Sequence, residues 1–132
     1  MPNEPEVICA SPDDWRRVRL SAALERAGYS VRTCATTREL LHLAARRREP
    51  VDEAGVLLLD ASLSEEIAPS KIVAALRRTC AAVRTVVLAD QNQESEIIEC
   101  LRVGADDYVH WPAEPSEIIA IVGRVMTLPR VR

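Results

Sequence analysis

The chain alternates short apolar runs with longer segments in which apolar residues recur every three or four positions. The short runs predict strands, and the longer segments predict amphipathic helices. Strands are expected at 7–10, 29–34, 56–60, 85–89 and 105–110, and helices at 14–27, 36–48, 70–80, 94–103 and 116–127. Because the connections are short, this order predicts a single α/β domain over residues 1–132, built on one parallel sheet.

The residues between these segments support the same boundaries. Gly28 and Gly104 stand where helices end, and Pro115 stands where a helix begins. The second helix is expected to begin at a capping box of Thr36 and Glu39 and to bury three of its apolar residues, namely Leu40, Leu41 and Ala44. The basic run 46–48 then lies in its last turn, where cations favour the helix dipole and face solvent.

The run Val56–Leu59 is followed by a carboxylate, Asp60. A fully apolar run of this length predicts a strand buried on both faces, and ligands of open α/β sheets bind at the carboxyl ends of such strands. Asp60 is therefore the main candidate for a functional residue. The alternative is that it only caps a helix or closes a turn.

Composition narrows the function classes. The chain has 132 residues, a net charge of −3 and a single lysine, Lys71. No basic field would attract nucleic acid directly, and no apolar stretch is long enough to span a membrane. The four cysteines lack metal-binding spacing and have no basic neighbour, so neither a zinc site nor a catalytic thiol is expected. Without a signal peptide at the start, we expect a cytoplasmic protein.

The motifs LLLD at 57–60, TVVLAD at 85–90, GADDY at 104–108 and the step Trp111–Pro112 resemble the receiver domain of bacterial two-component response regulators. The resemblance implies a flavodoxin-like (βα)5 fold with strand order 2-1-3-4-5, and helices one and five on one face. It implies that Asp60 matches the phosphoacceptor, Tyr108 the switch aromatic residue and Pro112 a cis-proline. The alternative is that Tyr108 and Pro112 are retained only for the fold.

Receivers place an acidic pair that holds Mg²⁺ directly after the first strand. Here the family spacing puts that pair at Ser11 and Pro12, while an alignment on Pro12 puts it at Cys9 and Ala10. Neither placement supplies a carboxylate. Mg²⁺ usually needs one or two carboxylates in near-octahedral geometry, and Asp60 alone is a poor cage, so no metal or other cofactor is expected.

Two further parts of the receiver site are absent from the sequence. Ala89 replaces the family's hydroxyl residue, and Trp111 replaces its lysine. Asp13 and Asp14 are the only acidic substitutes nearby, although capping the first helix explains them better. We therefore expect neither enzymatic activity nor efficient phosphoryl transfer to Asp60.

The leading interpretation is an atypical receiver that signals through protein contacts independent of phosphorylation. The contact, with a protein partner or a second copy, is expected on the face made by the fourth helix, fifth strand and fifth helix. The residues expected there are Ile97, His110, Trp111 and Ile121. Two alternatives stay open: slow phosphorylation of Asp60 assisted by Asp13 or Asp14, and a small ligand beside Trp111 and Ala89.

Overall fold

The computed structural model describes residues 5–46, 55–80 and 82–128. Its five strands are β1 (Glu6–Ala10), β2 (Ser30–Cys34), β3 (Val56–Asp60), β4 (Arg84–Ala89) and β5 (Asp107–His110). Its α-helices are α1 (Asp14–Arg26), α2 (Thr37–Arg46), α3 (Pro69–Thr79), α4 (Glu94–Arg102) and α5 (Pro115–Met126), and a 3₁₀ turn covers Gln91–Gln93.

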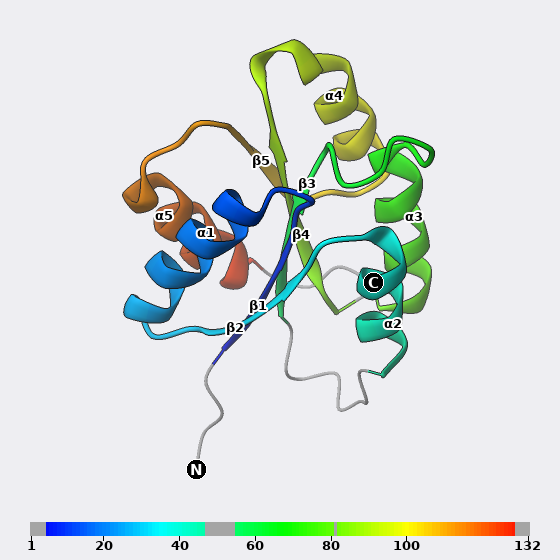
Figure 1. Cartoon of the computed structure of the whole chain (residues 1–132). Coiled ribbons are helices and arrows are strands. Elements are labelled where there is room, and N and C mark those ends of the chain that lie inside the picture. Colours follow the sequence, from blue (N-terminus) through cyan, green and yellow to red (C-terminus); the bar gives the residue numbers. More distant parts are fainter. Residues whose placement is uncertain (1–4, 47–54, 81, 129–132) are drawn as a thin grey trace.

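All strand pairs are parallel, in the order β2-β1-β3-β4-β5. Helices α1 and α5 cover one face of the sheet, and α2, α3 and α4 cover the other (Figure 1). The predicted flavodoxin-like fold is therefore confirmed. The central strands β3 and β4 are buried along their whole length, as their continuous apolar runs require.

Each face of the sheet has its own core. Ile8, Leu57 and Leu59 point toward the α2–α4 side, whereas Val7 and Leu58 point toward α1 and α5. This alternation follows from the two-residue period of a strand. The two cores fix the sheet between the helical layers and hold the carboxyl ends of the strands at one edge.

The chain ends its helices largely as the sequence predicts. Gly28 and Gly104 follow α1 and α4 with φ of +100° and +116°, conformations that disfavour a side chain. Pro115 begins α5, and the peptide between Trp111 and Pro112 is cis, as expected.

The second helix corrects one prediction. Leu40 is buried, but Leu41 is 42% exposed, and Leu43 packs against the core instead, beside Ala44. The two leucines at 40 and 41 lie about 100° apart around a helix, so only one of them can point at the sheet. The solvated end expected at 47–48, and the loop that follows, lie outside the described residues.

No helix within the described ranges is both long and apolar enough to cross a lipid bilayer.

Candidate functional site

Asp60 ends β3 and is 1% exposed, so its carboxylate is enclosed by the protein. The Ser11 hydroxyl donates to Oδ2 at 2.7 Å, and the backbone N–H of Ser62 donates to Oδ1 at 2.9 Å. A buried carboxylate requires such partners, and it also requires a compensating charge. These two donors satisfy part of that requirement.

The compensating charge comes from Arg16, in the first turns of α1. Its Nη1 donates to Asp60 Oδ2 at 2.9 Å, and its Nη2 donates to Asp90 Oδ1 at 3.2 Å. The guanidinium carbon also lies 5.1 Å from the centroid of the Trp111 ring, within the range of a cation–π contact. Arg16 thus joins the carboxyl ends of β3, β4 and β5.

The two carboxylates are connected by a second route as well. The Gln93 amide donates to the Ser62 hydroxyl at 3.0 Å and accepts from the Asp90 backbone N–H at 2.8 Å. The contacts form a closed ring, whose members are Asp60, Ser62, Gln93, Asp90 and Arg16. A ring of this kind restrains both loops that follow β3 and β4.

Sequence reasoning missed Arg16 and Asp90. An arginine on a helix is normally expected to face solvent, yet the Arg16 side chain is only 15% exposed. One feature of the sequence could have identified Arg16, namely its position three residues after Asp13, the N-cap of α1. The first turn of α1 begins at the strand ends, so its side chains lie within reach of Asp60.

The predicted site positions fall into two groups. Ser11 is 1% exposed and contacts Asp60 directly, and Trp111 contacts Arg16. Pro12 is exposed, and Ala89 is fully buried in the core on the α2–α4 side. Of the four positions at which this chain departs from the receiver pattern, Ser11 and Trp111 therefore belong to the present site. They contribute a hydroxyl and an aromatic ring in place of the family's carboxylate and lysine.

Asp13 and Asp14 do not reach Asp60. Asp13 caps α1 by accepting from the backbone N–H of Arg16 at 3.0 Å. Asp14 is 89% exposed at its side chain and pairs with Arg17. Among the residues that the structure describes, no group of three or more His, Cys, Asp or Glu side chains could hold a metal ion.

The face formed by α4, β5 and α5 differs from the one predicted. Ile97 is 2% exposed and belongs to the core, so its assignment to a contact surface is wrong. Ile121 is half-buried against the α1–α5 core. Because Ile121 lies one turn before Arg124, which pairs with Asp107 of β5, it borders the β5 side of α5.

The exposed apolar residues of this face come from the other side of α4. Ile98 and Leu101 are 45% and 39% exposed, and Tyr108 of β5 is 37% exposed rather than part of the core. Glu94, one turn before Ile98, lies 3.9 Å from His110 of β5, measured from Oε1 to Nε2. The Ile98 side of α4 therefore faces β5.

Tyr108 and His110 belong to the same surface. Their rings meet edge to face, with centroids 5.5 Å apart. Val109 between them packs toward α5, so both rings point toward α4. We call the set of Ile98, Leu101, Tyr108 and His110 the α4–β5 patch.

Three of the four cysteines, Cys9, Cys34 and Cys100, are buried in the core. Burial raises the pKa of the Cys9 thiol to about 12, with a smaller contribution from nearby Cys34. Burial also raises the pKa of Cys34 to about 11, followed by the charge of Glu39. These thiols are buried and protonated at neutral pH, as the sequence suggests.

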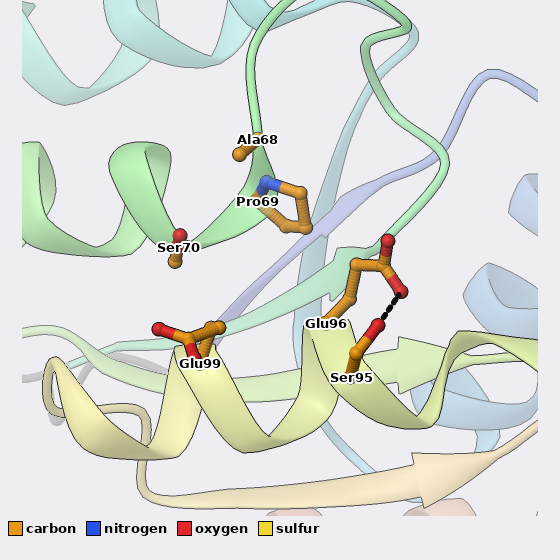
Figure 2. Close-up of a pocket in the computed structure, with 6 residues that line it drawn as sticks. All are labelled: Ala68, Pro69, Ser70, Ser95, Glu96 and Glu99. Atoms are coloured by element: carbon orange, nitrogen blue, oxygen red, sulfur yellow. Dashed lines mark hydrogen bonds between the residues drawn. The ribbon is translucent and has the colours of Figure 1, made fainter.

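Two hollows lie away from Asp60. One, of about 150 Å³, lies between the start of α3 and α4, where Ser70 faces Glu99 and Ser95 donates to Glu96 (Figure 2). The other, of about 360 Å³, lies between β2 and α2 and includes Cys34 and His42. Neither includes Ala89 or Trp111, and the Arg16 guanidinium lies over the Trp111 ring, beside which the small-ligand alternative would place its ligand.

A doubly wound parallel sheet hosts many unrelated functions, so the fold and the buried aspartate narrow the class of protein without naming it. The chain matches the family model of the response regulator receiver domain over residues 7–123. It therefore belongs to the response regulator receiver family.

The chain is 26% identical over 126 residues to the DNA-binding transcriptional regulator NtrC of Rhizobium meliloti, covering 96% of this chain and 25% of NtrC. It spans between 25% and 42% of the length of the first curated relatives that it matches. The receiver domain of NtrX from Brucella abortus has a TM-score of 0.82 at 14% identity, covering 93% of this chain and 99% of that one.

A response regulator from Burkholderia pseudomallei, solved with a phosphorylated aspartic acid, a calcium ion and citrate, has a TM-score of 0.76. It is 23% identical, and the match covers 90% of this chain and 66% of that one. These structures show the shared fold.

Proposed function

We propose that this receiver domain takes part in two-component signalling as an atypical member, which acts through protein contacts that do not require phosphorylation of Asp60. It would carry no enzymatic activity of its own and no cofactor. The observation that supports this proposal most strongly is the ion pair between Asp60 and Arg16. Both carboxylate oxygens of Asp60 are already hydrogen-bonded within the protein.

Phosphoryl transfer needs a nucleophilic oxygen that the phosphodonor can reach, whereas Asp60 is 1% exposed, and it needs cations arranged around the transferred group. The Burkholderia relative carries a phosphorylated aspartic acid and a calcium ion. In the present chain the Arg16 guanidinium lies directly on Asp60 Oδ2, and neither Ala89 nor Trp111 can supply a hydroxyl or an ammonium. The site therefore favours a fixed state over a phosphorylation cycle.

The α4–β5 patch is the surface through which the contact would form. Ile98, Leu101 and Tyr108 are all more than a third exposed, and they lie beside the edge strand β5. Fully burying an exposed Ile or Leu side chain contributes about 1.5–3 kcal/mol, so covering the 45% of Ile98 and the 39% of Leu101 that are exposed contributes roughly half of that for each. The simplest occupant is a second copy of the chain, because a two-fold contact would bring the same patch together twice.

Sedimentation equilibrium tests this proposal. The wild type should self-associate equally with and without a small phosphodonor plus Mg²⁺, and with little dependence on salt because the patch is largely apolar. Ile98→Glu should abolish the association. Leu41→Glu on α2 is the matched control, since Leu41 is 42% exposed and Ile98 is 45% exposed.

Association that appears only after phosphodonor treatment would contradict the proposal. So would an Ile98→Glu variant that associates as strongly as the Leu41→Glu control. A wild type that stays monomeric throughout would remove the second copy as the occupant of the patch.

The slow-phosphoacceptor alternative requires Arg16 to leave Asp60. Its support is Asp90, which Arg16 holds on the other side and which would become a second carboxylate near Asp60. Asp13 and Asp14 give it no support, because their contacts are with α1.

A further inference from the structure

We propose that the Arg16 guanidinium is a built-in cation that takes the place of the divalent metal at Asp60, and that its contact with Trp111 couples the charge state of this site to the end of β5. The inference concerns the regulation of the proposed receiver function, and in that sense rests on it. It is tested by metal binding and fluorescence rather than by association.

The first step is the charge at Asp60. The carboxylate is 1% exposed, and the Arg16 side chain is 15% exposed, so solvent screens their interaction poorly. Ser11 and Ser62 donate hydrogen bonds but bring no charge. Arg16 is the cation that balances Asp60, and it does so from within the same chain.

The second step is the lack of room for a metal. Mg²⁺ binds oxygens at about 2.0–2.1 Å in near-octahedral geometry and keeps several waters. Asp60 Oδ2 already accepts from both Ser11 and Arg16, and Asp90 Oδ1 also accepts from Arg16. A divalent ion would have to displace the guanidinium, which repels it. The residues present therefore do not fit the metal that other receivers hold.

The third step is the connection to β5. The same planar guanidinium that contacts the two carboxylates lies over the Trp111 ring, and Trp111 directly follows His110 of the α4–β5 patch. The backbone N–H of Trp111 donates to the carbonyl of Ala89 at 2.8 Å, so the backbone that carries the ring is anchored to the end of β4. Loss of the Asp60 charge would release one end of Arg16 and change the surroundings of this ring.

Helix α1 contains a matched control. Arg19 lies over Trp15 with its guanidinium carbon 5.6 Å from the ring centroid, and Trp15 is 66% exposed. This second arginine–tryptophan pair has similar geometry, and none of the described hydrogen bonds or ion pairs joins Arg19 to a carboxylate. It separates the effect of a cation–π contact alone from that of the Asp60 network.

The experiment uses Trp15→Phe as the parent, so that Trp111 is the only tryptophan. Trp111 emission and the thermal midpoint are measured with and without millimolar Mg²⁺ in the parent, Arg16→Ala, Arg16→Lys and Asp60→Asn. Arg19→Ala, made with Trp15 in place, is compared with the wild type. Parent and Arg19→Ala should show no change on adding Mg²⁺.

Arg16→Ala should shift Trp111 emission to longer wavelength and acquire a midpoint that Mg²⁺ raises, because Asp60 and Asp90 then have no cation between them. Asp60→Asn should shift the emission while Arg16 is still present. Arg16→Lys keeps the charge but loses the planar contact, so it should shift the emission and stay insensitive to Mg²⁺. If Arg16→Ala does not fold, the parent, Arg16→Lys and Asp60→Asn still decide the question.

A saturable Mg²⁺ response in the parent would overturn the replacement of the metal, and so would a folded Arg16→Ala that gains none. Unchanged Trp111 emission in Asp60→Asn would overturn the coupling. A Mg²⁺ response without phosphodonor-dependent association would refute this inference alone. If the protein does not respond to Mg²⁺ but associates only after phosphodonor treatment, the proposed function is refuted and this inference stands.

Discussion

Replacing Arg16 with methionine should destabilise the protein far more than the same change at Arg19. Breaking a buried ion pair by removing one partner costs about 3–5 kcal/mol, because an uncompensated charge stays buried. Asp60 keeps its donors from Ser11 and Ser62, and the Arg16 side chain is 15% exposed, so we expect the lower end, about 3 kcal/mol. That corresponds to a fall of about 10 °C in the thermal midpoint for a domain of this size.

A double-mutant cycle isolates the charge contribution. Asp60→Asn removes the charge with little change in volume, so Arg16→Met combined with Asp60→Asn should recover about 2 kcal/mol relative to Arg16→Met alone. Urea unfolding at neutral pH, followed by circular dichroism, gives the free energies of unfolding. Arg19→Met is expected to stay within about 0.5 kcal/mol of the wild type because Arg19 is exposed.

The reasoning is refuted if Arg16→Met costs no more than Arg19→Met. It is also refuted if Asp60→Asn does not reduce the cost of Arg16→Met, because the effect of Arg16 would then come from packing alone.

Two further predictions concern the thiols and the glycines. Burial holds the pKa of Cys9, Cys34 and Cys100 at about 12, 11 and 11, against 9.0 for an ordinary thiol, so the unfolded chain releases these protons first. The free energy of unfolding should therefore fall as pH rises from 9 toward 11–12, with a shallower slope in Cys9→Ala; an identical slope would contradict this assignment. Gly28→Ala should cost about 1–2 kcal/mol from its positive φ alone, since an added Cβ meets nothing within 4 Å. Gly104→Ala should cost a similar amount in the same urea assay, because its Cβ would lie 2.5 Å from Arg77 Cδ, which belongs to an exposed and flexible side chain that can move away; a cost several times larger would contradict this argument.

The sequence sufficed for the fold because the strong signals are local. Continuous apolar runs identify β3 and β4, which are buried on both faces, and glycine or proline identifies the ends of three helices. The order of βα units and the receiver motifs then define the topology. Asp60 lies at the end of its strand, as expected from the run that precedes it.

The patch was misassigned because helix phase is sensitive to one residue. Ile97 and Ile98 are adjacent, and a rotation of about 100° separates a core side chain from an exposed one. The polar neighbours of Ile98 are the signal that distinguishes them, since Glu94 and Arg102 lie one turn to either side of it. Leu40 and Leu41 present the same ambiguity, and the structure resolves both pairs through packing against the sheet.

Arg16 was missed for a different reason. Its partners, Asp60 and Asp90, lie 44 and 74 residues away in sequence, and the ion pairs exist only once α1 packs beside the strand ends. The positions at which receivers carry the acidic pair, the hydroxyl and the lysine have all lost those groups in this chain. The cation of this site is instead Arg16, which lies outside the receiver motifs of the sequence.

Intact mass measurement after incubation with a small phosphodonor and Mg²⁺ tests the central claim most directly. We expect an unchanged mass, because Asp60 is buried and its oxygens accept hydrogen bonds from Ser11, Arg16 and Ser62. Asp60→Ala, treated identically, is the control for labelling elsewhere. A wild type that gains the mass of one phosphate, absent from Asp60→Ala, would contradict the account.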